Sequence, residues 1–242
     1  MRYFVSFSYD GSCFTGFQRQ NKLRTVQGEF EYYLSALEEE PVDLVASGRT
    51  DKGVHAVNQC AHFDLSKKVT LYNLKKYLNR SFDGEIYVNN IEIVDDKFHA
   101  RYDVKSKEYS YFINMGTFNP MMRNYIYQYC DKLDVSKMKE ASMCLIGKHD
   151  FRSFCTDSKE KENCVRTINS IDFEEKDNIL KITFKGNGFL RKMIRNIVSI
   201  LIEIGSNEHD YKYMEEILNM KNRSGNLKCA FAGGLYLEKV NY

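Results

Sequence analysis

The sequence predicts an α+β protein made of two ferredoxin-like halves. Segments that alternate apolar and polar residues are followed by segments with helical spacing. This order recurs in a second, comparable series, and a chain of 242 residues is long enough for two cores. The change between the two series falls near residues 97–102, so we expect one domain at residues 1–100 and another at 101–242.

In the first half, alternating apolar positions predict strands, and apolar residues three and four apart predict helices. Thr25 and Thr70 stand before the helical segments, where their hydroxyls can cap the first turn. Asp10 and Gly11 predict a turn after the first strand, and Pro41 lies beyond the first helix. The strands are expected at residues 3–9, 42–46, 57–63 and 86–94, with helices after Thr25 and after Thr70.

The second half repeats this alternation, although the two halves are too dissimilar in sequence to demonstrate a duplication. Tyr109 and Tyr111 lie two residues apart on the first strand and therefore fall on one of its faces. Phe189 starts a strongly apolar helical stripe that runs to Ile204. The other elements expected here are a strand at 104–113, a helix at 135–145 after Asp134, a hairpin of strands at 165–173 and 179–184, a helix at 211–220 and a strand at 235–240.

The composition is that of a globular protein without a membrane segment, a disulfide framework or a metal centre. Charged residues make up 28% of the chain and apolar residues 43%, and no apolar run approaches the roughly 18 residues that span a bilayer. The N-terminus starts directly with a strand-like pattern and carries no secretory signal. The seven cysteines include no Cys-x-x-Cys pair. We therefore expect a cytoplasmic protein that uses no metal ion.

The net charge of +2 excludes a general polycation, so any RNA-binding face must come from local clusters of basic residues. The 17 tyrosines and 16 phenylalanines can supply faces on which bases stack, although most are expected in the core. Each basic cluster alone is equally compatible with a solvated surface. The candidate clusters are Arg19, Lys22 and Arg24; Lys105 and Lys107; and Arg191, Lys192 and Arg195.

The most informative segment, residues 47–56, places Asp51 in a loop bracketed by glycines. Arg49 precedes it by two positions, Lys52 follows it directly and His55 lies close behind. Neighbouring cations favour the charged form of a carboxylate, and glycines let the backbone bend sharply near a ligand. Such a carboxylate suits a nucleophile or a charge stabiliser better than a general acid. The same residues would also be ordinary in a structural turn with an Arg–Asp ion pair.

The loop Gly48-Arg49-Thr50-Asp51-Lys52-Gly53-Val54-His55-Ala56 resembles the signature of the TruA family of tRNA pseudouridine synthases, Gly-Arg-Thr-Asp-x-Gly-Val-His-Ala. The resemblance extends from Tyr9 to Leu237. The further matching segments are Tyr9-Asp10-Gly11-Ser12 with Gly16-Phe17-Gln18-Arg19-Gln20, Phe98-His99-Ala100-Arg101 with Tyr109-Ser110-Tyr111, Gly188-Phe189-Leu190 with Met193-Ile194-Arg195-Asn196, and Gly234-Leu235-Tyr236-Leu237.

Three positions depart from the family's pattern. Phe17 stands where the family usually has tryptophan, residues 82–86 lack the proline of Leu-Pro-x-Asp-Ile, and Ala230-Phe231 replaces Ala-Pro. These changes concern strand entry and packing and leave the proposed chemistry unaltered.

The resemblance implies that the two halves join in one continuous, mostly antiparallel sheet flanked by helices, with a central RNA-binding cleft. It implies a homodimer that binds tRNA and acts on uridines in the 3′ part of the anticodon stem-loop. It implies an isomerase that converts uridine to pseudouridine without a cofactor or metal. Neither DNA nor a membrane is an expected partner.

The resemblance also assigns roles to single residues. Asp51 is the expected nucleophile, although attack at ribose C1′ and at base C6 both stay open. Arg49 is expected to pair with Asp51 or a phosphate and to help extrude the base, and Tyr109 to lie under the flipped uracil. Arg195 is expected to reach the Asp51 carboxylate. On its periodicity alone, Tyr109 would be an ordinary half-buried strand residue.

The remaining polar residues of the loop and helix have structural interpretations. Thr50 is expected to brace the turn, and His55 to hydrogen-bond within the loop. Arg191 is expected on the same helix face as Arg195, most simply as part of a solvated surface. How Lys52, at the family's variable position, affects the substrate range stays open.

Two other functions fit parts of the pattern. An RNA-binding module could use the same cleft, but it would gain nothing from an aspartate facing phosphates. A metal-dependent nuclease or phosphatase would need clustered carboxylates and histidines, which Asp51 does not have nearby in sequence.

Overall fold

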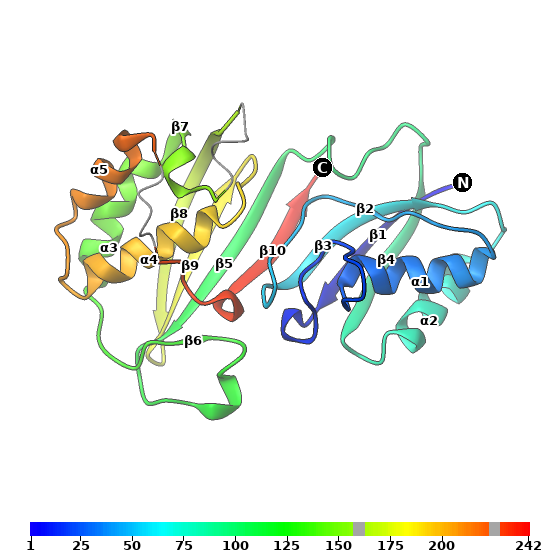
Figure 1. Ribbon diagram of the computed structural model, residues 1–242, viewed down its shortest axis with the longest axis horizontal. Coiled ribbons are helices and arrows are strands. Elements are labelled where there is room, and N and C mark those ends of the chain that lie inside the picture. The colour runs from blue at the N-terminus through cyan, green and yellow to red at the C-terminus, as the bar shows by residue number, and fades with distance from the viewer. Residues whose placement is uncertain (157–162, 223–227) are drawn as a thin grey trace. The chain divides into compact units, whose positions relative to one another are not determined.

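The computed structural model describes residues 1–156, 163–222 and 228–242, and the chain forms two compact units (Figure 1). Unit 1 contains Met1–Lys105 and Tyr236–Tyr242, and unit 2 contains Ser106–Leu235. The prediction of an α+β fold is confirmed, since both units combine a sheet with helices. The division lies close to the predicted boundary at residue 100, but the last strand returns to the first unit.

The sheet of unit 1 has the strand order β4-β1-β3. β1 is antiparallel to both of its neighbours, and two strands share the other edge of β3: β2 pairs with residues 61–62, and β10 pairs with residues 55–56. The elements of this unit are β1 (Arg2–Tyr9), a 3₁₀ turn (Gly11–Cys13), α1 (Val26–Glu38), β2 (Val45–Ala46), β3 (His55–Asp64), α2 (Leu71–Ser81), β4 (Ile86–Val94) and β10 (Leu235–Asn241).

The core of unit 1 follows from the alternation in β1, whose odd-numbered residues Tyr3 to Tyr9 are buried. The ring of Phe30 on α1 lies 4.5 Å from that of Phe7 and 4.6 Å from that of Phe82, which follows α2. Both helices therefore cover the same face of the sheet. Thr25 and Thr70 cap them as predicted, each accepting a hydrogen bond from a backbone N–H of the first turn.

The opposite face of β1 is covered by the segment that follows β4. Phe4 packs edge-on against Phe98 and Tyr242, with ring centroids 5.6 and 5.4 Å away. The Tyr242 hydroxyl donates to the carbonyl of Ala100 at 2.8 Å, and the N–H of Ala100 donates to Nδ1 of His62 at 3.1 Å. The motif that begins at Phe98 thus has a clear packing role in unit 1.

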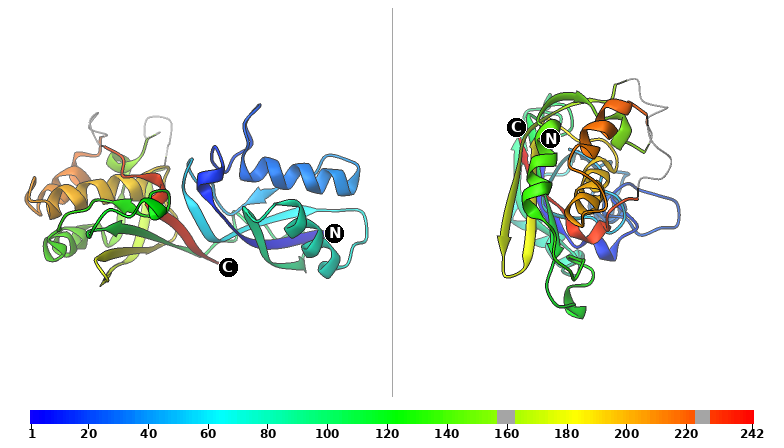
Figure 2. Two further views of the ribbon diagram at one scale, coloured as in Figure 1. Left: turned by 90° about the horizontal axis from the view of Figure 1, so that it is seen from below. Right: turned by 90° about the vertical axis from the view of Figure 1, so that its left-hand side faces the viewer.

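Unit 2 has an antiparallel sheet in the order β5-β9-β8-β7, with β6 paired in parallel to β5. Its helices α4 and α5 lie on one side of strands β8 and β9 (Figure 2). The strands are β5 (Ser106–Asn114), β6 (Tyr127–Gln128), β7 (Gly147–Asp150), β8 (Val165–Lys176) and β9 (Ile179–Gly186); the helices are α3 (Val135–Ser142), α4 (Met193–Gly205) and α5 (Tyr213–Met220), with 3₁₀ turns at Pro120–Met122, Met143–Leu145, Arg152–Phe154 and Ala232–Gly234.

The hairpin of β8 and β9 closes through Asp177 and Asn178, both with positive φ, as two-residue turns of such hairpins require. The predicted start of the apolar helix at Phe189 is wrong. Lys192 has a φ of 62°, which is incompatible with a helix interior, and α4 begins only at Met193. Arg191 is therefore outside the helix and does not share a helix face with Arg195. Within the described parts of the chain, no helix is long and apolar enough to cross a bilayer.

His62 is a buried titratable group whose pKa is changed by this packing. Burial lowers its pKa from 6.5 to about 4, and the positive charge of Arg2 acts in the same direction, followed by that of His99. Asp64 and Asp103 act weakly against them. Because Nδ1 accepts the Ala100 N–H, the neutral ring is the form that the fold requires.

We expect the free energy of unfolding to rise with pH between about 4 and 6.5 because of His62. In this window the unfolded chain binds a proton on the imidazole that the folded chain does not bind, so stability falls as the solution is acidified. Denaturant unfolding at several pH values would measure this dependence in the wild type and in His62→Gln. The variant should show a shallower slope, and equal slopes would contradict the expectation.

Candidate active site

The loop that carries Asp51 connects β2 to β3 in unit 1, as the sequence predicted. Asp51 is half-buried, whereas Arg49 and Lys52 are exposed. His55, the first residue of β3, is only 3% exposed. The loop therefore presents two cations to solvent around a partly covered carboxylate.

Gln59 on β3 fastens the start of this loop. Its side chain is fully buried and uses both ends: Oε1 accepts from the Ser47 hydroxyl at 2.7 Å, and Nε2 donates to the carbonyl of Gly48 at 3.1 Å. The N–H of Ser47 donates to the carbonyl of Cys60 at 2.8 Å. These bonds extend the strand pairing into the loop and limit its freedom before it reaches Asp51.

Thr50 holds the residue before Asp51, which confirms its predicted role as a brace. Its hydroxyl shares a hydrogen bond of 2.8 Å with that of Tyr9, and its carbonyl accepts from the N–H of Phe17 at 3.2 Å. Burial raises the pKa of Tyr9 to about 12, so its phenol stays protonated at neutral pH. The turn itself closes with a 3.2 Å bond from the N–H of Val54 to the carbonyl of Asp51.

The segment after β1 also clamps the loop, a function that the sequence patterns did not reveal. A Cβ at Gly11 would lie 2.0 Å from the carbonyl oxygen of Val54, so only glycine permits this approach. Gly16 has a φ of 105° and lies against the backbone of Thr50 to Lys52. The glycine bracketing of Asp51 thus includes glycines that lie far from it in sequence.

His55 completes the clamp. Its Nδ1 accepts the N–H of Gly11 at 3.0 Å and also lies 3.2 Å from Oδ1 of Asp10. Nδ1 therefore ties β3 to the segment that follows β1. The ring of Tyr236 stacks on it at 4.7 Å. These contacts confirm that His55 is a hydrogen-bonding residue of the loop.

Tyr109 and Tyr111 occupy one face of β5 in unit 2 but have different environments. Tyr111 is fully buried, its hydroxyl donates to the carbonyl of Phe231 at 2.8 Å, and burial raises its pKa. Tyr109 is 8% exposed, and the ring of Phe189 meets it edge-on at 5.4 Å. Tyr111 is thus a packing residue, while the ring of Tyr109, the fourth residue of β5, lies against that of Phe189.

Arg195 lies in the first turn of α4 and is half-buried. Its Nε donates to the carbonyl of Ala230 at 2.8 Å, and its own carbonyl accepts the N–H of Ala230 at 3.2 Å. Its positive charge also opposes the rise in the pKa of Tyr111, which places the guanidinium near that phenol. The planar fork of a guanidinium is a group that binds carboxylates and phosphates.

Asp51 and Arg49 thus lie in unit 1, and Tyr109 and Arg195 in unit 2. That the four meet in one site stays a prediction. In the parts of the chain that the structure describes, no group of three or more His, Cys, Asp or Glu side chains is placed to hold a metal ion.

Comparison with known proteins identifies relatives over nearly the whole chain. A family model described as tRNA pseudouridine synthase matches residues 5–103 and 141–242. A protein of Bacillus cereus named tRNA pseudouridine synthase A 2 is 40% identical over 242 residues, which cover 99% of both chains. Proteins named tRNA pseudouridine synthase A from Streptococcus agalactiae and Limosilactobacillus reuteri are 42% and 38% identical, and the matches cover 100% of this chain and 95% and 96% of theirs.

We expect Thr50→Val to lower the free energy of unfolding by about 1 kcal/mol or more, because it removes a partner of the buried Tyr9 phenol. Tyr9→Phe combined with Thr50→Val should cost less than the sum of the two single changes, since neither polar group is then left alone. Denaturant unfolding of the four proteins measures this coupling. Additive costs would show that the bond does not brace the loop.

Proposed function

Because the chain belongs to the tRNA pseudouridine synthase family, we propose that it isomerises uridine to pseudouridine in tRNA. The observation that carries the proposal is the Asp51 loop, complete in sequence and clamped by hydrogen bonds from both sides. The resemblance of the motifs extends the proposal to uridines of the anticodon stem-loop, to a homodimer and to a cytoplasmic location.

The proposed reaction breaks the bond between uracil N1 and ribose C1′, turns the base and rejoins it through C5. The C5 proton is lost and N1 gains a proton, so the product is an isomer of the substrate and no redox partner is needed. Asp51 would add through its carboxylate to C1′ or C6 and leave again when the new bond forms. A loop held on both sides suits this role, because a positioned nucleophile avoids the cost of reorganisation during the reaction.

Tyr109 would serve as the platform for the flipped base. Extrusion of a uridine costs a few kcal/mol, and stacking on an aromatic ring returns on the order of 1–3 kcal/mol. The edge-on contact with Phe189 holds the ring in one orientation. The phenol would also accept or relay the proton that leaves C5.

The two arginines would supply the positive charge. Arg49 is exposed beside Asp51, which suits contact with a phosphate next to the extruded nucleotide. Arg195 is oriented by the carbonyl of Ala230, and we propose that its fork faces the Asp51 carboxylate.

We expect Asp51→Asn to lower the rate of pseudouridine formation by at least about 10⁴-fold, because the amide is not a nucleophile. Its affinity for tRNA should stay within about threefold of the wild type. Asp83→Asn, which makes the same change at an exposed carboxylate of unit 1, is the control and should leave both quantities unaltered. Single-turnover formation of pseudouridine and equilibrium tRNA binding check the result, and turnover by Asp51→Asn would refute the assignment.

For Tyr109→Phe we expect unchanged tRNA affinity and slower product formation, because the ring still stacks but the hydroxyl is lost. Tyr111→Phe provides the contrast: it should lower the melting temperature through loss of the bond to Phe231 and leave the rate unchanged. Release of tritium from C5 of labelled tRNA measures the step directly. A wild-type rate in Tyr109→Phe would exclude a proton-transfer role for its hydroxyl.

A further inference from the structure

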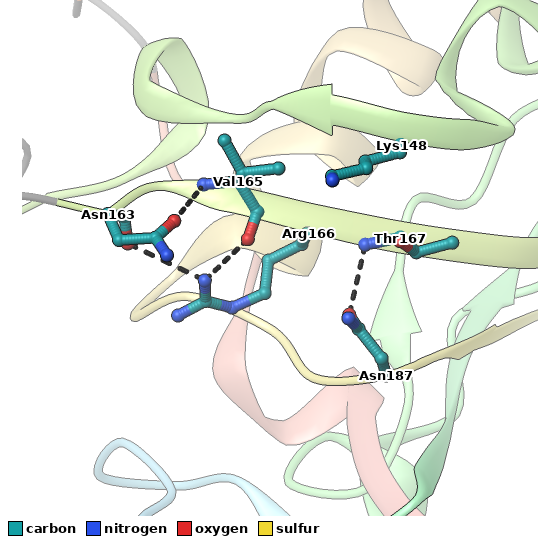
Figure 3. Close-up of a pocket in the computed structure, with 6 residues that line it drawn as sticks. All are labelled: Lys148, Asn163, Val165, Arg166, Thr167 and Asn187. Atoms are coloured by element: carbon teal, nitrogen blue, oxygen red, sulfur yellow. Dashed lines mark hydrogen bonds between the residues drawn. The ribbon is translucent and has the colours of Figure 1, made fainter.

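Unit 2 has an open hollow beside the start of β8 that none of the proposed roles uses (Figure 3). Its volume is about 580 Å³. Two of its residues carry a positive charge, two carry an amide, and none carries a carboxylate. The lining residues are Lys148, Asn163, Val165, Arg166, Thr167 and Asn187.

Both asparagine side chains present donors to this hollow, because their oxygens are already engaged. Oδ1 of Asn187 accepts the N–H of Thr167 at 2.9 Å, and Oδ1 of Asn163 accepts the N–H of Val165 at 2.9 Å (Figure 3). Each amide is therefore turned with its oxygen toward the β8 backbone. The NH₂ group of each is left as the end that can bind a ligand.

Arg166 and Lys148 add the charge. Nη1 of Arg166 donates to the carbonyls of Val165 at 2.6 Å and Asn163 at 3.5 Å. These two bonds orient the guanidinium, which has five N–H donors in all. Lys148 is exposed on the neighbouring strand β7, directly opposite Thr167 in the register. A surface with two cations, donor amides and no carboxylate matches the chemistry of a phosphate group.

The hollow lies next to the proposed base platform within unit 2. Gly188 sits against the Arg166 side chain, since a Cβ at Gly188 would lie 3.9 Å from its Cδ and Nε. The next residue, Phe189, makes the edge-on contact with Tyr109. Asn187 and Phe189 are two residues apart, so at most about 7 Å of extended chain separates the lining of the hollow from the residue that touches the platform.

We propose that this hollow binds a backbone phosphate of the RNA, on a nucleotide adjacent to the uridine that stacks on Tyr109. The inference rests on the proposed function, because it needs an RNA whose target base lies at Tyr109. A phosphate contact at this distance would fix the register of the strand, whereas the stacking platform itself accepts any base. The same donors would also bind free phosphate, and the experiments distinguish the two sources.

The first experiment measures the salt dependence of tRNA binding by the wild type, Lys148→Gln and Lys176→Gln. Lys176 is an exposed lysine at the opposite end of β8, so its variant is a control for the same change in net charge. The logarithm of the association constant for tRNA falls linearly with the logarithm of the salt concentration. Loss of one phosphate contact should make this slope less steep by about 0.7–0.9. We expect this reduction, with about three- to tenfold weaker binding, only for Lys148→Gln. Equal slopes for the two variants would overturn the proposal.

The second experiment locates the phosphate in a synthetic anticodon stem-loop. Methylphosphonates, which carry no charge, replace single phosphates on either side of the target uridine. At one position we expect the substitution to weaken binding to the wild type but not to Lys148→Gln, as a double-mutant cycle requires for a direct contact. If no position showed this coupling, the assignment to the RNA backbone would be wrong.

Inorganic phosphate tests the other source of the same chemistry. Its titration can be followed by the NMR signals of the Asn187 side-chain amide. Shifts that Lys148→Gln abolishes, together with an unchanged salt slope for tRNA, would assign the hollow to a free anion and overturn the proposal. A wild type that bound tRNA but formed no pseudouridine would refute the proposed function instead, and the slopes would still decide whether the hollow holds a phosphate.

Discussion

The approach of Gly11 to the carbonyl of Val54 is the contact on which the candidate catalytic loop depends. No side chain fits between the two backbones, since even a Cβ would lie 2.0 Å from the oxygen. This approach brings the N–H of Gly11 to Nδ1 of His55, and the nearby Gly16 lies against Thr50 to Lys52. The loop is therefore held between β3 and the segment after β1, with Asp51 at its bend.

Polar groups buried around this contact are satisfied by one another. Tyr9 bonds to Thr50, Gln59 bonds to Ser47 and the carbonyl of Gly48, and His55 receives the N–H of Gly11. A buried donor or acceptor without a partner would cost about 1–3 kcal/mol, so each group restricts the conformations that the loop can adopt. In the proposed function, this restriction keeps the carboxylate in place while the base leaves and returns.

Unit 2 achieves a similar restraint with aromatic rings and the carbonyls of two adjacent residues. Phe231 receives the Tyr111 hydroxyl, and the neighbouring Ala230 exchanges hydrogen bonds with Arg195. The segment before β10 thus positions the arginine and anchors the tyrosine that stays inside the core. Tyr109, on the same strand face, meets the ring of Phe189 edge-on and is the platform that we propose. Asn187, which lines the donor-rich hollow, lies two residues before that phenylalanine.

The sequence by itself determined most elements and the identity of the loop around Asp51. Strand alternation, the caps at Thr25 and Thr70 and the β8–β9 turn act over a few residues, so their signals are present in any short window. Tertiary structure decided the start of α4 at Met193, the clamp at Gly11 and the return of the last strand to unit 1. It also gave Tyr109 and Tyr111 different degrees of burial, although periodicity alone treats the two residues as equivalent. These features arise from contacts between residues far apart in the chain, and local patterns carry no record of which distant backbone or ring will pack against a given position.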